Sequence, residues 1–93
     1  MRITENEKNT ICNAVNIRDT DAKIYLFGSR ADDSKKGGDI DLLVISQELS
    51  QKDIRKIRRN IIDQIGEQKI DIILAKDLQK PFTKIAANEG VLL

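Results

Sequence analysis

The chain has 93 residues and a mass of 10.5 kDa, with 16 basic and 15 acidic side chains and a formal net charge of +1. A chain of this length forms one small domain with a modest core, so we expect a single domain over residues 1–93 and a substrate that is small or is brought by a partner. The balanced charge creates no broad field that would attract nucleic acid or a membrane, and we expect neither as a direct partner.

Missing residue types exclude several kinds of chemistry. The chain contains no histidine, which excludes a Ser-His-Asp or Cys-His relay and a His-ligated zinc site. Cys12 is the only cysteine, so an intramolecular disulfide and a cysteine-rich metal cluster are also excluded. No apolar run reaches transmembrane length and the first residues lack a signal-peptide hydrophobic segment, so we expect a cytoplasmic protein. Catalysis would depend on carboxylates, lysines, hydroxyls and hard cations.

The first half of the chain predicts one helix and two strands. A capping-box pattern followed by apolar residues at helical intervals predicts a helix over roughly residues 4–17. The run 23–27 is β-branched, aromatic and apolar on both faces, which predicts a strand inside a sheet. Residues 31–38 are polar and end in two glycines, which favours one helical turn followed by a loop. The apolar run 40–45 predicts the second strand.

The second half predicts a long amphipathic helix, a strand and a short final helix. Ser50 begins a capping-box pattern, and isoleucines then recur on one helical face until Gly66 can end the helix. Residues 69–74 form an apolar run interrupted by one aspartate, which predicts the third strand. Pro81 can start a last helix that Gly90 ends before an apolar tail. This order predicts an α/β (α+β) fold in which helices flank a small mixed sheet of three to four strands.

Two surfaces have both a structural and a functional interpretation. Five basic residues lie on the predicted long helix: Lys52, Arg55, Lys56, Arg58 and Arg59. They form either a solvated face or a docking surface for an acidic partner, and no interleaved aromatic residues suggest base stacking. Phe82 and the apolar tail 91–93 either cover the core or form an exposed patch for that partner.

Three aspartates are candidates for a metal site. Asp39 and Asp41 are two residues apart, so on an extended strand both side chains leave the same face. Asp71 interrupts an apolar run, where a charge is costly to bury unless it is paired or metal-bound. If the third strand lies beside the second, Asp71 joins the other two, and two Mg²⁺ ions fit such a cluster for an in-line displacement at phosphorus. The alternatives are solvated carboxylates at a strand end and on an edge strand.

Gly28 and Ser29 follow the first predicted strand. A Gly-Ser turn can present N–H groups and a hydroxyl to phosphate oxygens, although Gly-Ser is also an ordinary loop signal. The spacing is not that of a Walker loop. Arg30, Lys35 and Lys36 follow in the sequence and either neutralise phosphate charge or are simply solvated cations.

Together, these motifs resemble the minimal nucleotidyltransferases (MNT) of the DNA polymerase β superfamily. The shared pattern is Phe27-Gly28-Ser29-Arg30-Ala31, then Asp39-Ile40-Asp41, and later Asp71 inside an apolar strand. The resemblance covers nearly the whole chain and implies the nucleotidyltransferase fold. It also implies that Gly28, Ser29 and Arg30 bind the triphosphate of an NTP. Finally, it implies that Asp39, Asp41 and Asp71 hold two Mg²⁺ ions, with Asp71 helping to activate the acceptor hydroxyl.

Within that superfamily, the chain is similar to the MntA-like antitoxins that pair with HEPN ribonuclease toxins. The similarity implies transfer of AMP from ATP to a hydroxyl of a HEPN partner, a tyrosine in the related systems. Two positions differ: Asp32-Asp33 stand where family members commonly have Arg-Gly, and Gly38 stands where they commonly have Ser. The alternative is a catalytically weak MNT-fold protein that neutralises its partner by binding alone. A small-molecule transferase is a third hypothesis, which the short chain disfavours.

Overall fold

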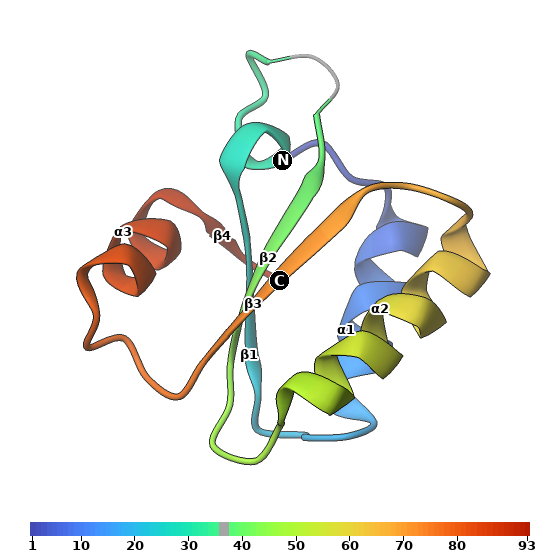
Figure 1. The fold of residues 1–93 in the computed structure, drawn as a ribbon. Helices are drawn as coiled ribbons and strands as arrows, with labels where there is room; N and C mark the ends of the chain where they lie inside the picture. The colour runs from blue at the N-terminus through green and yellow to red at the C-terminus, as the bar shows by residue number, and fades with distance from the viewer. Residues whose placement is uncertain (36–37) are drawn as a thin grey trace.

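The computed structural model describes residues 1–35 and 38–93 and contains a four-stranded sheet between two helical layers (Figure 1). The strands are β1 (Lys23–Phe27), β2 (Ile40–Ile45), β3 (Ile70–Ala75) and β4 (Val91–Leu92), in the spatial order β3-β2-β1-β4. Strand β2 is parallel to β3 and antiparallel to β1, and β1 is antiparallel to β4. The sheet is therefore mixed, as the sequence predicted, and β1 lies in its interior.

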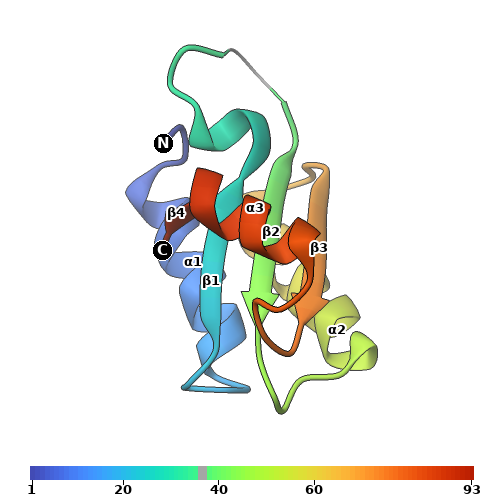
Figure 2. The ribbon, with the colours of Figure 1, turned by 90° about the vertical axis from the view of Figure 1, so that its left-hand side faces the viewer.

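The helices cover both faces of the sheet unequally. Helices α1 (Glu5–Asn16) and α2 (Gln51–Ile65) pack on one face, and α3 (Pro81–Glu89) crosses the other alone (Figures 1 and 2). The main core lies on the α1/α2 face, because alternate residues of each strand point there. Its fully buried side chains include Ile11, Leu26, Leu42, Ile57 and Ile61.

The helix ends follow signals in the sequence. Thr4 and Ser50 cap α1 and α2. Each hydroxyl accepts a hydrogen bond from the backbone N–H three residues later, at Glu7 or Asp53, and the carboxylate of that residue accepts one from the backbone N–H of the capping residue. Gly66 follows α2 with a φ of +94°, a conformation that favours glycine. Pro81 occupies the first turn of α3. Within the described ranges, no helix combines the length and apolarity needed to span a bilayer.

The position of the short helical turn differs from the expectation. The turn predicted within residues 31–38 lies earlier, as the 3₁₀ helix η1 (Gly28–Ala31) directly after β1. Gly28 has a φ of +72°, so the chain changes direction as soon as the strand ends. Residues 36–37 of the expected turn, and with them Lys36, lie outside the described residues.

The apolar tail extends the sheet. Val91 and Leu92 pair with β1 as β4, and Leu93 packs against the core. Leu92 is nevertheless 57% exposed. Phe82 on α3 is 53% exposed, although its ring meets that of Phe27 edge-on with centroids 6.1 Å apart. The tail thus covers the edge of β1, while Phe82 and Leu92 remain at the surface.

Candidate active site

Asp41 and Asp71 stand opposite each other on β2 and β3. The two strands run parallel, and Asp41 is in register with Asp71. Their neighbours along each strand belong to the core on the α1/α2 face or pack against it. Strand alternation therefore directs both carboxylates to the α3 face of the sheet. The strand adjacency on which the sequence interpretation depended is present.

Asp39 lies immediately before β2 and is paired with Lys69. The Nζ atom of Lys69 lies 3.5 Å from Oδ2 of Asp39. The amide of Ile40 donates to the carbonyl of Lys69 at 3.1 Å, which joins the starts of β2 and β3. The sequence interpretation did not include Lys69 among the site residues, because its contact with Asp39 depends on the pairing of β2 with β3. The structure thus brings three aspartates and this lysine to one end of the sheet.

The charges of these groups act together on Asp41. Its pKa is raised, first by partial burial and then by the negative charges of Asp71 and Asp39, while Lys69 opposes the shift. A cation beside Asp41 would relieve this repulsion. Across residues 1–35 and 38–93, no three acidic side chains are close enough to hold one ion between them. The facing carboxylates still fit Mg²⁺, because that ion is commonly held by one or two carboxylates together with substrate phosphates.

Gly28 packs directly against Asp41. Phe27 pairs with Asp41 across the sheet, so the turn that follows β1 begins beside this carboxylate. A Cβ atom on Gly28 would lie 2.5 Å from Oδ2 of Asp41, and the φ of +72° also favours glycine. The Gly-Ser turn and the acidic residues, which the sequence presented as separate motifs, therefore form one site.

The chain segment that returns to β2 closes against Ser29. A Cβ atom on Gly38 would lie 2.0 Å from Oγ of Ser29, and Gly38 has a φ of +92°. A side chain there would displace the Ser29 hydroxyl, which explains why glycine stands directly before Asp39. From the other side, Nη2 of Arg2 donates to the carbonyl of Ser29 at 2.8 Å. These contacts fix the position of the turn.

Arg30 braces the same turn. Its Nε donates to the carbonyl of Gly38 at 3.1 Å, and its Nη1 donates to the carbonyl of Arg2 at 3.1 Å. Backbone carbonyls thus engage two of its nitrogen atoms. The expected contact of Arg30 with a nucleotide stays a prediction.

A shallow pocket of about 450 Å³ opens beside Gly28 and Ser29. It is also lined by Ala31, Asp32, Asp33, Lys35 and Glu89. The carboxylate of Asp32 accepts hydrogen bonds from the hydroxyl and the amide of Ser34, at 2.7 and 2.9 Å, and these bonds lower its pKa. The charge of Asp32 is therefore partly engaged within its own turn.

Comparison with known proteins adds a family assignment to this geometry. The family model described as "Polymerase beta, Nucleotidyltransferase" matches residues 9–93. The matched range contains the Gly-Ser turn, all three aspartates and the four strands. No curated protein matches the chain significantly.

Proposed function

Because the chain belongs to the polymerase β nucleotidyltransferase family, we propose that it transfers AMP from ATP to a hydroxyl of a partner protein in a Mg²⁺-dependent reaction. The observation that carries this proposal is the register of Asp41 with Asp71, with Gly28 packed against Asp41. One end of the sheet thereby presents two carboxylates beside a turn suited to phosphate. This combination of groups suits a metal-assisted displacement at phosphorus.

The proposed reaction is an in-line displacement at the α-phosphorus of ATP. The acceptor oxygen forms a new O–P bond, the bond from the α-phosphorus to the bridging oxygen of the β-phosphate breaks, and pyrophosphate leaves. The hydroxyl proton passes to a carboxylate oxygen of Asp71, and the N–H groups of Gly28 and Ser29 bind the triphosphate. When bound at Asp39, Asp41 and Asp71, two Mg²⁺ ions supply charge neutralisation for this displacement.

The proposed acceptor is a tyrosine of a HEPN toxin, for which this chain would be the antitoxin. The sequence of the motif, Gly28-Ser29-Arg30-Ala31, resembles that of the MNT antitoxins and supports this choice. The position of Asp71 also supports it, since this residue is exposed on the edge strand β3, where another protein can approach.

One observation favours the alternative in which the protein neutralises its partner by binding alone. Among the described residues that line the pocket beside Gly28 and Ser29, three are acidic, Asp32, Asp33 and Glu89, and one is a cation, Lys35. Such a lining is unfavourable for a triphosphate unless metal ions offset the charge. Weak nucleotide binding is the expected consequence.

The test is transfer of label from α-labelled ATP, with Mg²⁺, to proteins in a lysate of the source cells. The unmodified chain should label a protein band, and Asp41→Asn and Asp71→Asn should each abolish the label. Asp21→Asn is the matched control, because Asp21 is exposed in the loop before β1 and should leave labelling unchanged. If no variant labels any protein while a partner copurifies with the chain, transfer is refuted and binding alone is supported.

A further inference from the structure

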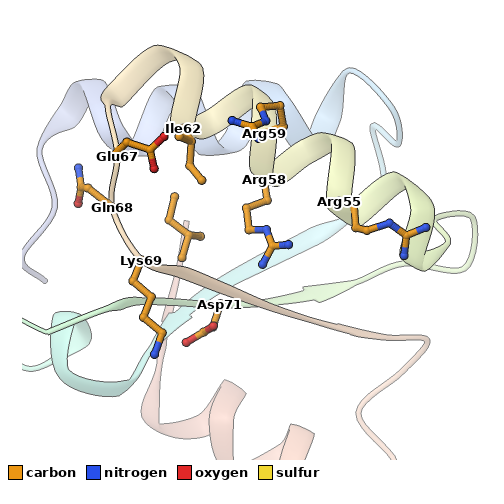
Figure 3. A pocket seen from close by; sticks show the side chains of 9 residues that line it. Arg55, Arg58, Arg59, Ile62, Glu67, Gln68, Lys69 and Asp71 are labelled. Carbon is orange, nitrogen blue, oxygen red and sulfur yellow. The ribbon is translucent and has the colours of Figure 1, made fainter.

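A basic groove adjoins the candidate active site. A cavity of about 520 Å³ lies between α2 and the start of β3, here called the α2–β3 groove (Figure 3). Arg55, Arg58 and Arg59 of α2 form one wall, and Lys69 and Asp71 are among the residues opposite. The proposed proton acceptor therefore belongs both to the reaction site and to this groove.

Two arginines of the groove are available to an anionic ligand. Nη1 of Arg59 lies 4.0 Å from Oδ1 of Asp63, whereas Arg55 and Arg58 form no ion pair with any described residue. Figure 3 shows Arg58 extending from α2 toward β3, whereas the Asp71 carboxylate points away from α2, on the other side of β3. Since side chains alternate between the two faces of a strand, a strand added at the edge of β3 can direct some side chains to Arg58 and the next ones to Asp71. A guanidinium group binds a carboxylate through two parallel hydrogen bonds, which makes arginine well suited to acidic ligands.

The groove also follows an open sheet edge. Among the described strands, β3 pairs with β2 alone. The carbonyls of Lys69 and Ala75 accept hydrogen bonds from β2, so alternation turns the backbone groups of Ile70, Ile72 and Leu74 toward the open edge. An extended peptide can pair with such an edge as an added strand.

We propose that the α2–β3 groove binds an acidic, extended segment of the acceptor protein and brings its hydroxyl to Asp71. This inference rests on the proposed function, because it names the substrate feature that the same site recognises. The backbone of the segment pairs with β3, and its carboxylates meet Arg55 and Arg58. No aromatic side chain lines the groove, so it offers nucleic-acid bases no stacking surface, and a peptide is favoured over RNA.

The test measures peptide binding in the absence of ATP. The probe is a fluorescein-labelled peptide with one central tyrosine flanked by glutamates, and its comparison is the same peptide with glutamines. Fluorescence anisotropy should show tighter binding of the glutamate peptide. The double substitution Arg55→Gln/Arg58→Gln should weaken that binding by about tenfold, because it removes two charge-assisted contacts.

The matched control is Lys52→Gln/Lys56→Gln. It removes the same charge from exposed positions of the same helix that do not line the groove, and it should change the affinity less than about twofold. Equal losses in the two double variants would overturn the proposal, as would equal binding of the glutamate and glutamine peptides. Tighter binding of single-stranded RNA in the groove would also overturn it.

Two further measurements separate this inference from the proposed function. Asp41→Asn, a change outside the groove, should retain peptide binding while losing AMP transfer, and this result supports both proposals. If Arg55→Gln/Arg58→Gln transfers AMP with an unchanged KM for the acceptor, the groove does not bind the acceptor, and the proposed transferase activity is still supported. If the peptide binds as expected but no protein is ever labelled, the assignment of transfer fails and the groove remains an acidic-peptide site.

Discussion

At the scale of single residues, the contact between Gly28 and Asp41 joins the fold to the proposed chemistry. Replacing Gly28 by alanine places a methyl carbon 2.5 Å from a carboxylate oxygen, at a φ of +72° that alanine rarely adopts. We expect Gly28→Ala to lower the free energy of unfolding by about 1–3 kcal/mol and to abolish AMP transfer, because Asp41 must move. Urea unfolding and the label-transfer assay measure the two effects.

Gly66→Ala is the matched control for that substitution. Gly66 also has a positive φ, +94°, but a Cβ atom added there would have no heavy atom of the described residues within 4 Å, apart from those of Gly66 and its chain neighbours. The control should therefore lose stability through backbone strain while retaining transfer activity. If Gly28→Ala keeps full activity, the contact with Asp41 does not matter for the chemistry.

Asp41 itself should lower the stability of the metal-free protein at neutral pH. Its pKa is raised in the folded state by burial and by the charges of Asp71 and Asp39, so its ionisation disfavours folding. This penalty is absent below the pKa of the unfolded chain and is complete once the pH has risen through the folded-state value. With a chelator present, Asp41→Asn should be more stable than the unmodified protein at pH 7 by about 0.5 kcal/mol, a small value because solvent screens a partly exposed group.

The sign of this effect can be checked by its pH dependence. The advantage of Asp41→Asn should shrink as the pH is lowered and should vanish at about pH 3, where Asp41 is mostly protonated in both the folded and the unfolded state. Denaturant unfolding at several pH values measures it, with Asp21→Asn as the reference. If the stability advantage of Asp41→Asn instead grows as the pH is lowered, the pKa of Asp41 is not raised in the folded protein.

At the scale of elements, the two helical layers should differ in what they contribute to stability. Ile57 of α2 is fully buried, whereas Ile85 of α3 is 56% exposed. The same change to alanine should therefore cost about 3 kcal/mol at Ile57, through lost apolar contacts and a cavity, and less than about 0.5 kcal/mol at Ile85. Similar losses at both positions would mean that α3 buries Ile85 against another surface.

The sequence predicted the elements whose signals are local. Capping residues before α1 and α2, the isoleucine spacing of α2, and Pro81 at the start of α3 each depend on a few neighbouring residues, and each matches the structure. The helical turn was misplaced because a positive φ at Gly28 moved it next to β1. The tail was not assigned as a strand, because a two-residue strand forms only where β1 offers a free edge.

At the scale of the whole molecule, the candidate site depends on strand order. The sequence identified Asp39, Asp41 and Asp71, but only the parallel pairing of β2 with β3 places Asp71 opposite Asp41. Register arises from packing the apolar faces of both strands against α1 and α2, a non-local condition. The contacts of Gly28 with Asp41 and of Lys69 with Asp39 follow from the same packing, so no local pattern could have predicted them.

The unequal covering of the sheet also predicts unequal local stability. On the α1/α2 face, α2 buries Ile54, Ile57 and Ile61, whereas α3 buries only Thr83 and Ala86 among its own residues. A helix with so little buried apolar surface should open without global unfolding. Native-state hydrogen exchange should therefore show amides of α3 exchanging at a free energy several kcal/mol below that of α2, whose slowest amides should report global unfolding.

Nucleotide binding should reduce this difference, because α3 crosses the face that carries Asp41 and Asp71 (Figure 2). A ligand that binds only the closed state of α3 lowers the population of its open state. Adding Mg²⁺ and a non-hydrolysable ATP analogue should therefore slow exchange in α3 and η1 while leaving α1 unchanged, and Asp41→Asn should lose the effect. Protection that appears equally in α1, or that persists in Asp41→Asn, would place the nucleotide away from the α3 face.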